Sequence, residues 1–117
     1  MRISAVILTK NEEKNIKDCI DSLKFCDEVI VIDDFSDDNT IRIAESSGAK
    51  VYSRKLNNNF ASQRNYALDK CSGEWILFTD ADERVTEKLA SEKLKIDFQT
   101  NQYVGFYIKR EDTMLGK

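Results

Sequence analysis

Residues 28–40 read EVIVIDDFSDDNT, and this stretch indicates the fold more clearly than any other part of the sequence. Residues 29–32 are four consecutive β-branched residues, which is typical of a central parallel strand covered on both faces. The strand stops at Asp33 and Asp34. Ser36 is then expected to cap a helix. A strand that leads directly into a helix is the repeating unit of an α/β domain.

Similar patterns lie on both sides of this unit. Apolar runs predict further strands at residues 3–8, 51–52 and 75–78. Apolar periodicity predicts one helix after Asn11, which is expected to cap it, and another over about 60–71, with Ala61, Leu68 and Cys71 on its inner side. Weaker patterns suggest a helix at 86–94 and a strand at 103–109. Residues 1–117 are therefore expected to form one α/β domain, a three-layer sandwich with a mainly parallel sheet.

The composition limits the partners that this chain can have. Its 18 basic and 21 acidic residues give a net charge of −3, whereas proteins that bind nucleic acid usually carry a basic excess, so no nucleic-acid partner is expected. A slightly acidic protein can still bind a phosphate group if a metal cation lies between the charges. The first apolar run is too short to span a membrane, and a cytoplasmic location is expected, with peripheral contact at the inner membrane face.

Acidic residues follow three of the predicted strands. Glu12 comes shortly after the first strand, Asp33 and Asp34 follow the second, and Asp80 and Asp82 follow the fourth. In an open α/β sheet, ligands bind beyond the carboxyl ends of the strands. Like charges gathered there repel one another. Their grouping is explained if a divalent cation, sugar hydroxyls or base N–H groups lie among them.

Asp80-Ala81-Asp82 is the sharpest of these elements. Two carboxylates separated by one small residue can point at one hard cation, and Mg²⁺ or Mn²⁺ commonly takes one or two carboxylates, then water and phosphate oxygens. Such a cation can neutralise a diphosphate leaving group. The alternative is a solvated turn whose acids cap a helix.

Each of the other candidate site residues has both a possible ligand-binding role and a possible structural role. Asp34, supported by Asp33, can accept a hydrogen bond from a base N–H or a ribose hydroxyl, or both can be turn-forming residues before a helix. Glu12 can serve a ribose, or can lie in the first turn of a helix. Arg64, on the third predicted helix, can approach phosphates or base, or remain a surface arginine.

Four segments in this order resemble the family 2 glycosyltransferases, which have the GT-A fold. The matching segments are SAVILTKNEEKNI at 4–16, EVIVIDDFSDDNT at 28–40, ASQRNYAL at 61–68 and CSGEWILFTDADE at 71–83. The resemblance covers the Rossmann-like nucleotide-binding half of that fold. It is closest to the bacterial branch that acts on lipopolysaccharide core and other cell-surface glycans.

The resemblance implies a role for each candidate residue. Thr9 and Glu12 would line the nucleotide pocket, and Asp34 would contact the base with support from Asp33. Arg64 would contact the base or the diphosphate. Asp80 would bind ribose or the water shell of the metal, and Asp82 would bind the metal, Mg²⁺ or Mn²⁺, directly.

The resemblance also implies a reaction. Family members transfer a sugar from a nucleotide-diphosphate donor, usually UDP-linked, onto a glycan or lipid-linked acceptor, here in cell-envelope polysaccharide synthesis. Inverting members use a carboxylate base that lies well downstream of the metal motif, and no matching base is found before Lys117. The chain is therefore expected to be a truncated donor-binding half that lacks the acceptor-binding half. The open sheet edge that this leaves would favour a homo-oligomer.

Three other classes of protein remain as alternatives. A catalytically inactive module would bind the nucleotide-sugar and transfer nothing. A receiver-like signalling domain would use Asp80 as its phosphoacceptor, although its acidic pair should end the first strand instead of the second. A nucleotidyltransferase would need a Gly-rich, basic loop after the first strand, and TKNEEKN at 9–15 contains no Gly.

Overall fold

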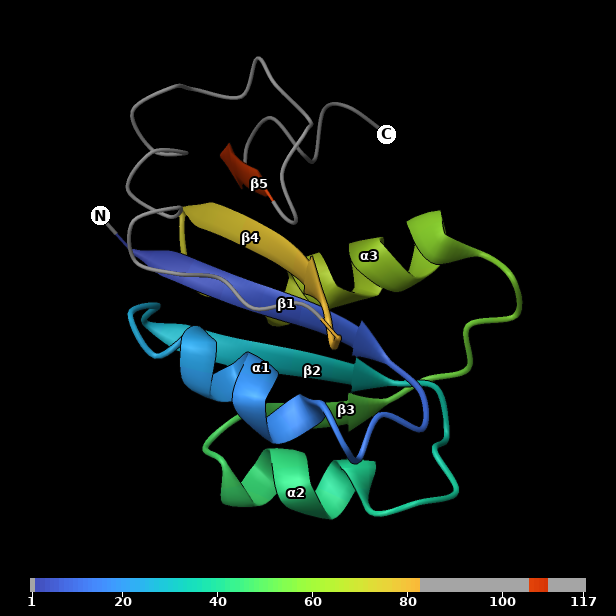
Figure 1. Cartoon of the computed structure of the whole chain (residues 1–117). Helices are drawn as coiled ribbons and strands as arrows, with labels where there is room; N and C mark the ends of the chain where they lie inside the picture. Colours follow the sequence, from blue (N-terminus) through green and yellow to red (C-terminus); the bar gives the residue numbers. More distant parts are fainter. Residues whose placement is uncertain (1, 83–105, 110–117) are drawn as a thin grey trace.

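The computed structural model describes residues 2–82 and 106–109, and its centre is one five-stranded sheet (Figure 1). The strands lie in the order β3-β2-β1-β4-β5. Their bounds are β1 Ile3–Thr9, β2 Glu28–Asp33, β3 Lys50–Ser53, β4 Trp75–Asp80 and β5 Phe106–Lys109. The first four strands are parallel, and β5 pairs antiparallel with β4. The mainly parallel α/β sheet predicted from the sequence is confirmed.

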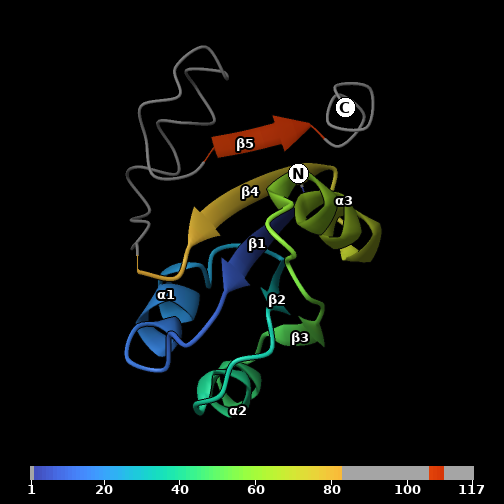
Figure 2. The ribbon, with the colours of Figure 1, turned by 90° about the vertical axis from the view of Figure 1, so that its right-hand side faces the viewer.

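Helices cover both faces of this sheet and make it the middle of three layers (Figure 2). The helices are α1 Ile16–Ser22, α2 Thr40–Ser46 and α3 Phe60–Lys70. One core cluster joins α1 and α2 to the side chains of Ala5, Ile7 and Val31, and the other joins α3 to the opposite face. Because successive strand side chains point to opposite faces, strands covered on both faces must be apolar throughout, as residues 29–32 are.

Three local expectations are wrong, each because a residue makes a different contact. Asn11 does not cap α1, which begins at Ile16, because Asn11 lies in the left-handed region with φ 53° and binds the β2–α2 loop. Ser36 does not cap α2, because its hydroxyl donates to Asp33. Leu68 and Cys71 are buried as expected, but Ala61 is exposed, and Gln63 and Ala67 face the core in its place.

The two weaker predictions fall mainly outside the described residues. The helix expected at 86–94 lies entirely there. Of the strand expected at 103–109, the structure describes only β5, which covers its last four residues. Among the described residues, no helix has the length and apolar character needed to cross a membrane.

A buried carboxylate ties strands together at the amino end of the sheet. Glu28 accepts hydrogen bonds from Ser4 on β1 and from the backbone N–H of Ser72, at 2.6 Å, and contacts Lys50 on β3. Burial raises the pKa of Glu28, but the hydrogen bonds together lower it by more than burial raises it. The pKa of Glu28 therefore falls from its ordinary value of 4.5 to about 2. Glu28, the first residue of β2, thus ties this strand to β1, to β3 and to the loop before β4, at the end opposite the candidate site.

Glu28 makes stability depend on acid. Because its folded-state pKa is below its unfolded value, its contribution is complete above pH 4.5 and is lost as the pH falls from about 4.5 to about 2. Glu28→Gln should lower the free energy of unfolding at pH 7 by up to about 3 kcal/mol. In urea titrations the difference from wild type should shrink between pH 5 and about 2.5. A difference that does not change with pH would contradict this role, and Glu45→Gln on the exposed surface of α2 is the control.

Candidate functional site

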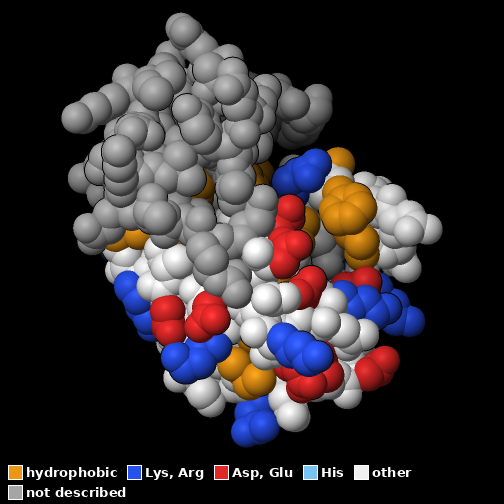
Figure 3. Space-filling view, viewed as in Figure 1, with side chains coloured by type: hydrophobic (Ala, Val, Ile, Leu, Met, Phe, Trp, Pro, Cys, Tyr) orange, Lys and Arg blue, Asp and Glu red, His pale blue; other side chains and the backbone are white. Residues whose placement is uncertain are grey.

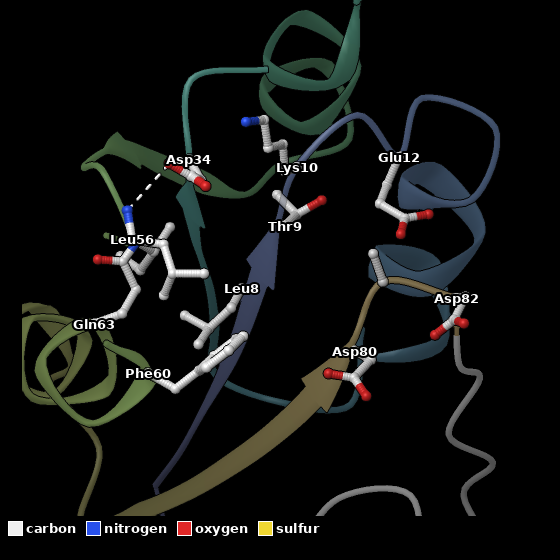
Figure 4. A pocket seen from close by; sticks show the side chains of 12 residues that line it. Leu8, Thr9, Lys10, Glu12, Asp34, Leu56, Phe60, Gln63, Asp80 and Asp82 are labelled. Carbon is white, nitrogen blue, oxygen red and sulfur yellow. Dashed lines mark hydrogen bonds between the residues drawn. The ribbon is translucent and has the colours of Figure 1, made fainter. Parts of the chain in front are cut away.

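A pocket lies where β1, β2 and β4 end, at the carboxyl edge of the sheet (Figure 4). Its volume is about 330 Å³. In the space-filling view, acidic and hydrophobic side chains border a hollow on this side of the molecule (Figure 3). The pocket is lined by Leu8, Thr9, Lys10, Glu12, Ile32, Asp34, Leu56, Phe60, Gln63, Asp80, Ala81 and Asp82.

The register of the strands brings these residues together. Thr9 on β1 pairs with Asp33 on β2, and Leu8 pairs with Asp80 on β4. Residues that are far apart in the sequence therefore end at the same level of the sheet. Five of the predicted site residues line this one pocket: Thr9, Glu12, Asp34, Asp80 and Asp82.

The pocket has an acidic side and an apolar side. Figure 4 shows Glu12, Asp80 and Asp82 on one side, and Leu8, Leu56 and Phe60 on the other. A ligand that fits both sides carries a charged or polyhydroxyl part and a flat or apolar part. Nucleotides have this construction.

Asp34 fixes a loop and also faces the pocket. One of its carboxylate oxygens accepts a hydrogen bond from the backbone N–H of Leu56, at 3.0 Å, which holds the β3–α3 loop against the end of β2. The other oxygen is turned toward the pocket (Figure 4). This oxygen can accept a hydrogen bond from a ligand N–H or O–H group.

Asp33 has a different place from its neighbour. It is fully buried, does not line the pocket, and accepts hydrogen bonds from the backbone N–H and the hydroxyl of Ser36, at 2.7 and 2.6 Å. Two donors on one buried carboxylate stabilise its charge and fix the start of the β2–α2 loop. Asp33 can therefore support Asp34 without touching a ligand.

The β1–α1 and β2–α2 loops hold each other through reciprocal hydrogen bonds. Asn11 donates its N–H to Ser36 Oγ and accepts from the Asp37 N–H, both at 2.7 Å. The N–H of Glu12 donates to Thr40 Oγ1 at 2.9 Å. Asn tolerates the left-handed conformation better than most residues, which suits it to this position. These bonds, here called the loop clasp, set where Glu12 stands at the pocket.

Thr9 presents an unused polar group. The residue is 6% exposed and lines the pocket, and its hydroxyl makes no hydrogen bond within residues 2–82 and 106–109. A buried hydroxyl without a partner costs free energy that a ligand can recover. Thr9 is therefore positioned to bind a ligand in the pocket.

Asp80 and Asp82 suit a hard cation that takes part of its shell from a ligand. Ala81 is buried between them, whereas both aspartates are exposed and line the pocket. No group of three or more Asp, Glu, His or Cys residues that could hold a metal occurs in the described part of the chain. Two carboxylates are enough for Mg²⁺ or Mn²⁺ when phosphate and water complete the coordination.

Arg64 is exposed on α3 and is not among the residues that line the pocket. Arg54, which the sequence did not suggest, lies at the start of the β3–α3 loop instead. Its guanidinium donates to Gln63 Oε1 at 2.9 Å and to Ser62 Oγ at 3.0 Å, and the Gln63 amide donates back to the Arg54 carbonyl at 2.7 Å. This exchange explains how a glutamine is buried on the inner side of α3.

The sequence also gave no reason to select Lys10, Leu56 or Phe60, which complete the pocket wall. Lys10 borders this pocket and a second cavity of about 300 Å³, which is lined by Asp34, Phe35, Lys55, Leu56, Asn57 and Asn58. The available signal was position alone, since Lys10 directly follows β1 and Phe60 begins α3.

Comparison with known proteins identifies the family. Residues 4–114 match the family described as glycosyl transferase family 2, and the chain belongs to that family. It is 42% identical over 111 residues to an uncharacterized glycosyltransferase of Rickettsia bellii, covering 92% of this chain and 37% of that protein. It is 30% identical over 118 residues to the lipopolysaccharide core biosynthesis glycosyltransferase LpsC of Rhizobium meliloti, covering 97% and 44%.

A solved structure extends the comparison to the fold. Glucosyl-3-phosphoglycerate synthase of Mycobacterium tuberculosis, in complex with Mn²⁺, UDP and glucosyl-3-phosphoglycerate, superimposes with a TM-score of 0.61 and 32% identity, covering 68% of this chain and 33% of that one. The same enzyme has been solved with Mg²⁺ and UDP. The fold is therefore that of the GT-A glycosyltransferases, and the receiver and nucleotidyltransferase alternatives have no support. The chain spans less than half the length of the relatives it matches.

The loop clasp can be tested without a ligand. Asn11→Gly keeps the left-handed backbone but removes the acceptor of the Asp37 N–H, so hydrogen exchange at that amide should accelerate by about tenfold, the equivalent of one modest hydrogen bond. Asn11→Asp keeps an oxygen acceptor and should exchange at close to the wild-type rate. NMR measures the hydrogen-exchange rate of the Asp37 amide. Equal exchange rates in wild type and Asn11→Gly would show that the Asn11 side chain does not hold the loop.

Proposed function

We propose that the pocket binds the nucleoside diphosphate of a sugar donor, UDP-linked, and that the complete protein transfers the sugar to a glycan or lipid-linked acceptor in cell-envelope polysaccharide synthesis. The observation that carries this proposal is the division of one pocket into an acidic side and an apolar side at the carboxyl edge of the sheet. Family membership supports sugar transfer. LpsC supports the envelope role, and the mycobacterial complex supports UDP.

In this proposal each residue that lines the pocket binds the part of the donor nearest to it. Asp80 and Asp82 hold Mg²⁺ or Mn²⁺, which when bound neutralises charge on the leaving diphosphate. Asp34 accepts a hydrogen bond from the base, and the Thr9 hydroxyl binds the nucleoside. Glu12, placed by the loop clasp, binds a ribose hydroxyl. Arg64 lies outside the pocket wall, so a contact with the diphosphate would need its long side chain to reach inward.

Transfer also requires a base that removes the proton of the acceptor hydroxyl. Among residues 2–82 and 106–109 no group is assigned to this step. The residues derived above bind and orient the donor, and catalysis by the complete protein needs an acceptor site in addition. Donor binding is therefore the activity to measure on this chain.

Metal-dependent UDP binding is the first test. Calorimetric titration with UDP is expected to show micromolar to millimolar affinity with Mn²⁺, and much weaker binding without it, because two carboxylates and a diphosphate repel unless a cation lies between them. Asp82→Ala should remove the Mn²⁺ dependence and leave the circular dichroism spectrum unchanged, since Asp82 is exposed. Asp69→Ala, on an exposed position of α3, is the control. Unchanged Mn²⁺-dependent affinity in Asp82→Ala would refute the metal assignment.

Asp34 is expected to select the base. Uracil presents an N–H donor where cytosine presents an acceptor, and a carboxylate can only accept. Asp34→Asn keeps an oxygen for the Leu56 N–H but offers an NH₂ group to the base. UDP affinity should then fall by about tenfold or more, with or without metal, while the ratio of CDP to UDP affinity rises. If only the metal-dependent part of binding changed, Asp34 would act on the diphosphate instead.

A further inference from the structure

Phe60 is an exposed aromatic residue at the wall of the pocket. Phe60 and Phe35, with 54% and 52% of their surface exposed, are the large hydrophobic residues that the described part of the chain leaves in water. Phe60 lines the pocket that contains Asp34, Asp80 and Asp82, whereas Phe35 lines only the neighbouring cavity. In Figure 4 the ring of Phe60 lies next to Leu8, on the apolar side.

The backbone around Phe60 is held in place although its side chain is exposed. Asn59 caps α3 by accepting from the Ser62 N–H at 2.9 Å, and its own N–H donates to the Leu56 carbonyl at 2.9 Å. Arg54 and Gln63 exchange hydrogen bonds one turn further on. Phe60 is the first residue of α3, so these contacts fix its Cα from both sides. An aromatic ring on a fixed backbone loses little freedom when a ligand packs on it.

We propose that Phe60 is the platform on which the base of the donor nucleotide stacks, and that it therefore contributes to the affinity of the site for the donor. The proposal rests on the proposed function above. A base is a flat ring that needs a partner for its face as well as for its edge. Asp34 offers an acceptor to the edge, and Phe60, with Leu8 and Leu56 beside it, offers an aromatic and aliphatic surface to the face.

The polarity of the pocket then orients the whole donor. With the base on the apolar side, the diphosphate extends toward Asp80 and Asp82, where the cation would lie. The reverse orientation would place the phosphates against the apolar side chains of Phe60 and Leu56 and next to the Asp34 carboxylate, and it would place the base among the carboxylates. The sugar is thus directed to the β4 edge of the pocket.

Phe35 supplies a matched control. It is about equally exposed, but it lines a different cavity, and its ring already has the Lys55 ammonium 6.0 Å from its centroid. Replacing either phenylalanine removes the same surface from water. Only the Phe60 replacement removes an aromatic surface from the pocket that Asp34, Asp80 and Asp82 line.

The experiment measures two ligands on five proteins. UDP and methyl diphosphate, which keeps the phosphates and lacks the base and ribose, are titrated with Mn²⁺ into wild type, Phe60→Ala, Phe60→Leu, Phe60→Tyr and Phe35→Ala. UDP affinity should fall by about tenfold in Phe60→Ala and Phe60→Leu, and stay within about twofold of wild type in Phe60→Tyr and Phe35→Ala. Methyl diphosphate affinity should be the same in all five.

The outcomes separate this inference from the proposal beneath it. Wild-type UDP affinity in Phe60→Ala would overturn the stacking role while leaving donor binding intact. An equal loss of UDP and methyl diphosphate affinity in Phe60→Ala would also overturn it, since the ring would then shape the loop instead of the base site. Full affinity in Phe60→Leu would show that apolar bulk suffices and an aromatic face does not matter. No binding of UDP to wild type would overturn the proposed function, and the stacking role with it.

Discussion

The parallel pairing of β1 with β2 on one side and β4 on the other is the constraint on which the site depends. Parallel strands run in the same direction, so their carboxyl ends meet at one edge, and the register places Thr9 beside Asp33 and Leu8 beside Asp80. Because β2 is apolar and buried on both faces, burial alone does not set this register, whereas a shift of one residue would break the hydrogen bonds that Glu28 on β2 accepts from Ser4 and from the Ser72 N–H. At the amino edge, Glu28 holds the same strands together.

Gathering carboxylates at one edge has an electrostatic cost, and the chain meets it in two ways. Asp33 is buried, and two donors from Ser36 stabilise its charge. Asp80 and Asp82 stay at the exposed mouth of the pocket, where water lowers the repulsion between them. The protein thus separates the carboxylate that supports the loop from those that can bind a ligand.

The sequence predicted the elements well where local pattern determines structure. Residues 29–32 could hardly be anything but an interior strand, and the alternation of strands and helices leaves few arrangements other than a parallel sheet. The placement of Asp34, Asp80 and Asp82 at one pocket follows from that topology. Arg64 shows the limit of this reasoning, because position on a helix does not say which way a long side chain faces.

Local pattern failed where tertiary contacts compete with it. Asn11 and Ser36 are good helix caps by residue type, but Asn11 hydrogen-bonds to a loop 25 residues away. The Ser36 hydroxyl accepts that bond and donates to Asp33, three residues before it. Gln63 is polar yet buried, because Arg54 satisfies its amide, so periodicity chose Ala61 in its place. Phe60 went unnoticed because an isolated aromatic residue at a helix start has no distinctive sequence pattern.

The central claim is that the acidic side of the pocket holds the diphosphate of a nucleotide through a divalent cation. A crystal of the chain grown with UDP and Mn²⁺, measured at the manganese absorption edge, tests it most directly. Anomalous density within coordination distance of Asp82, with the diphosphate bridging to it and the base between Asp34 and Phe60, is the expected result. Manganese or UDP bound elsewhere on the chain, with the pocket between β1, β2 and β4 empty, would contradict the claim.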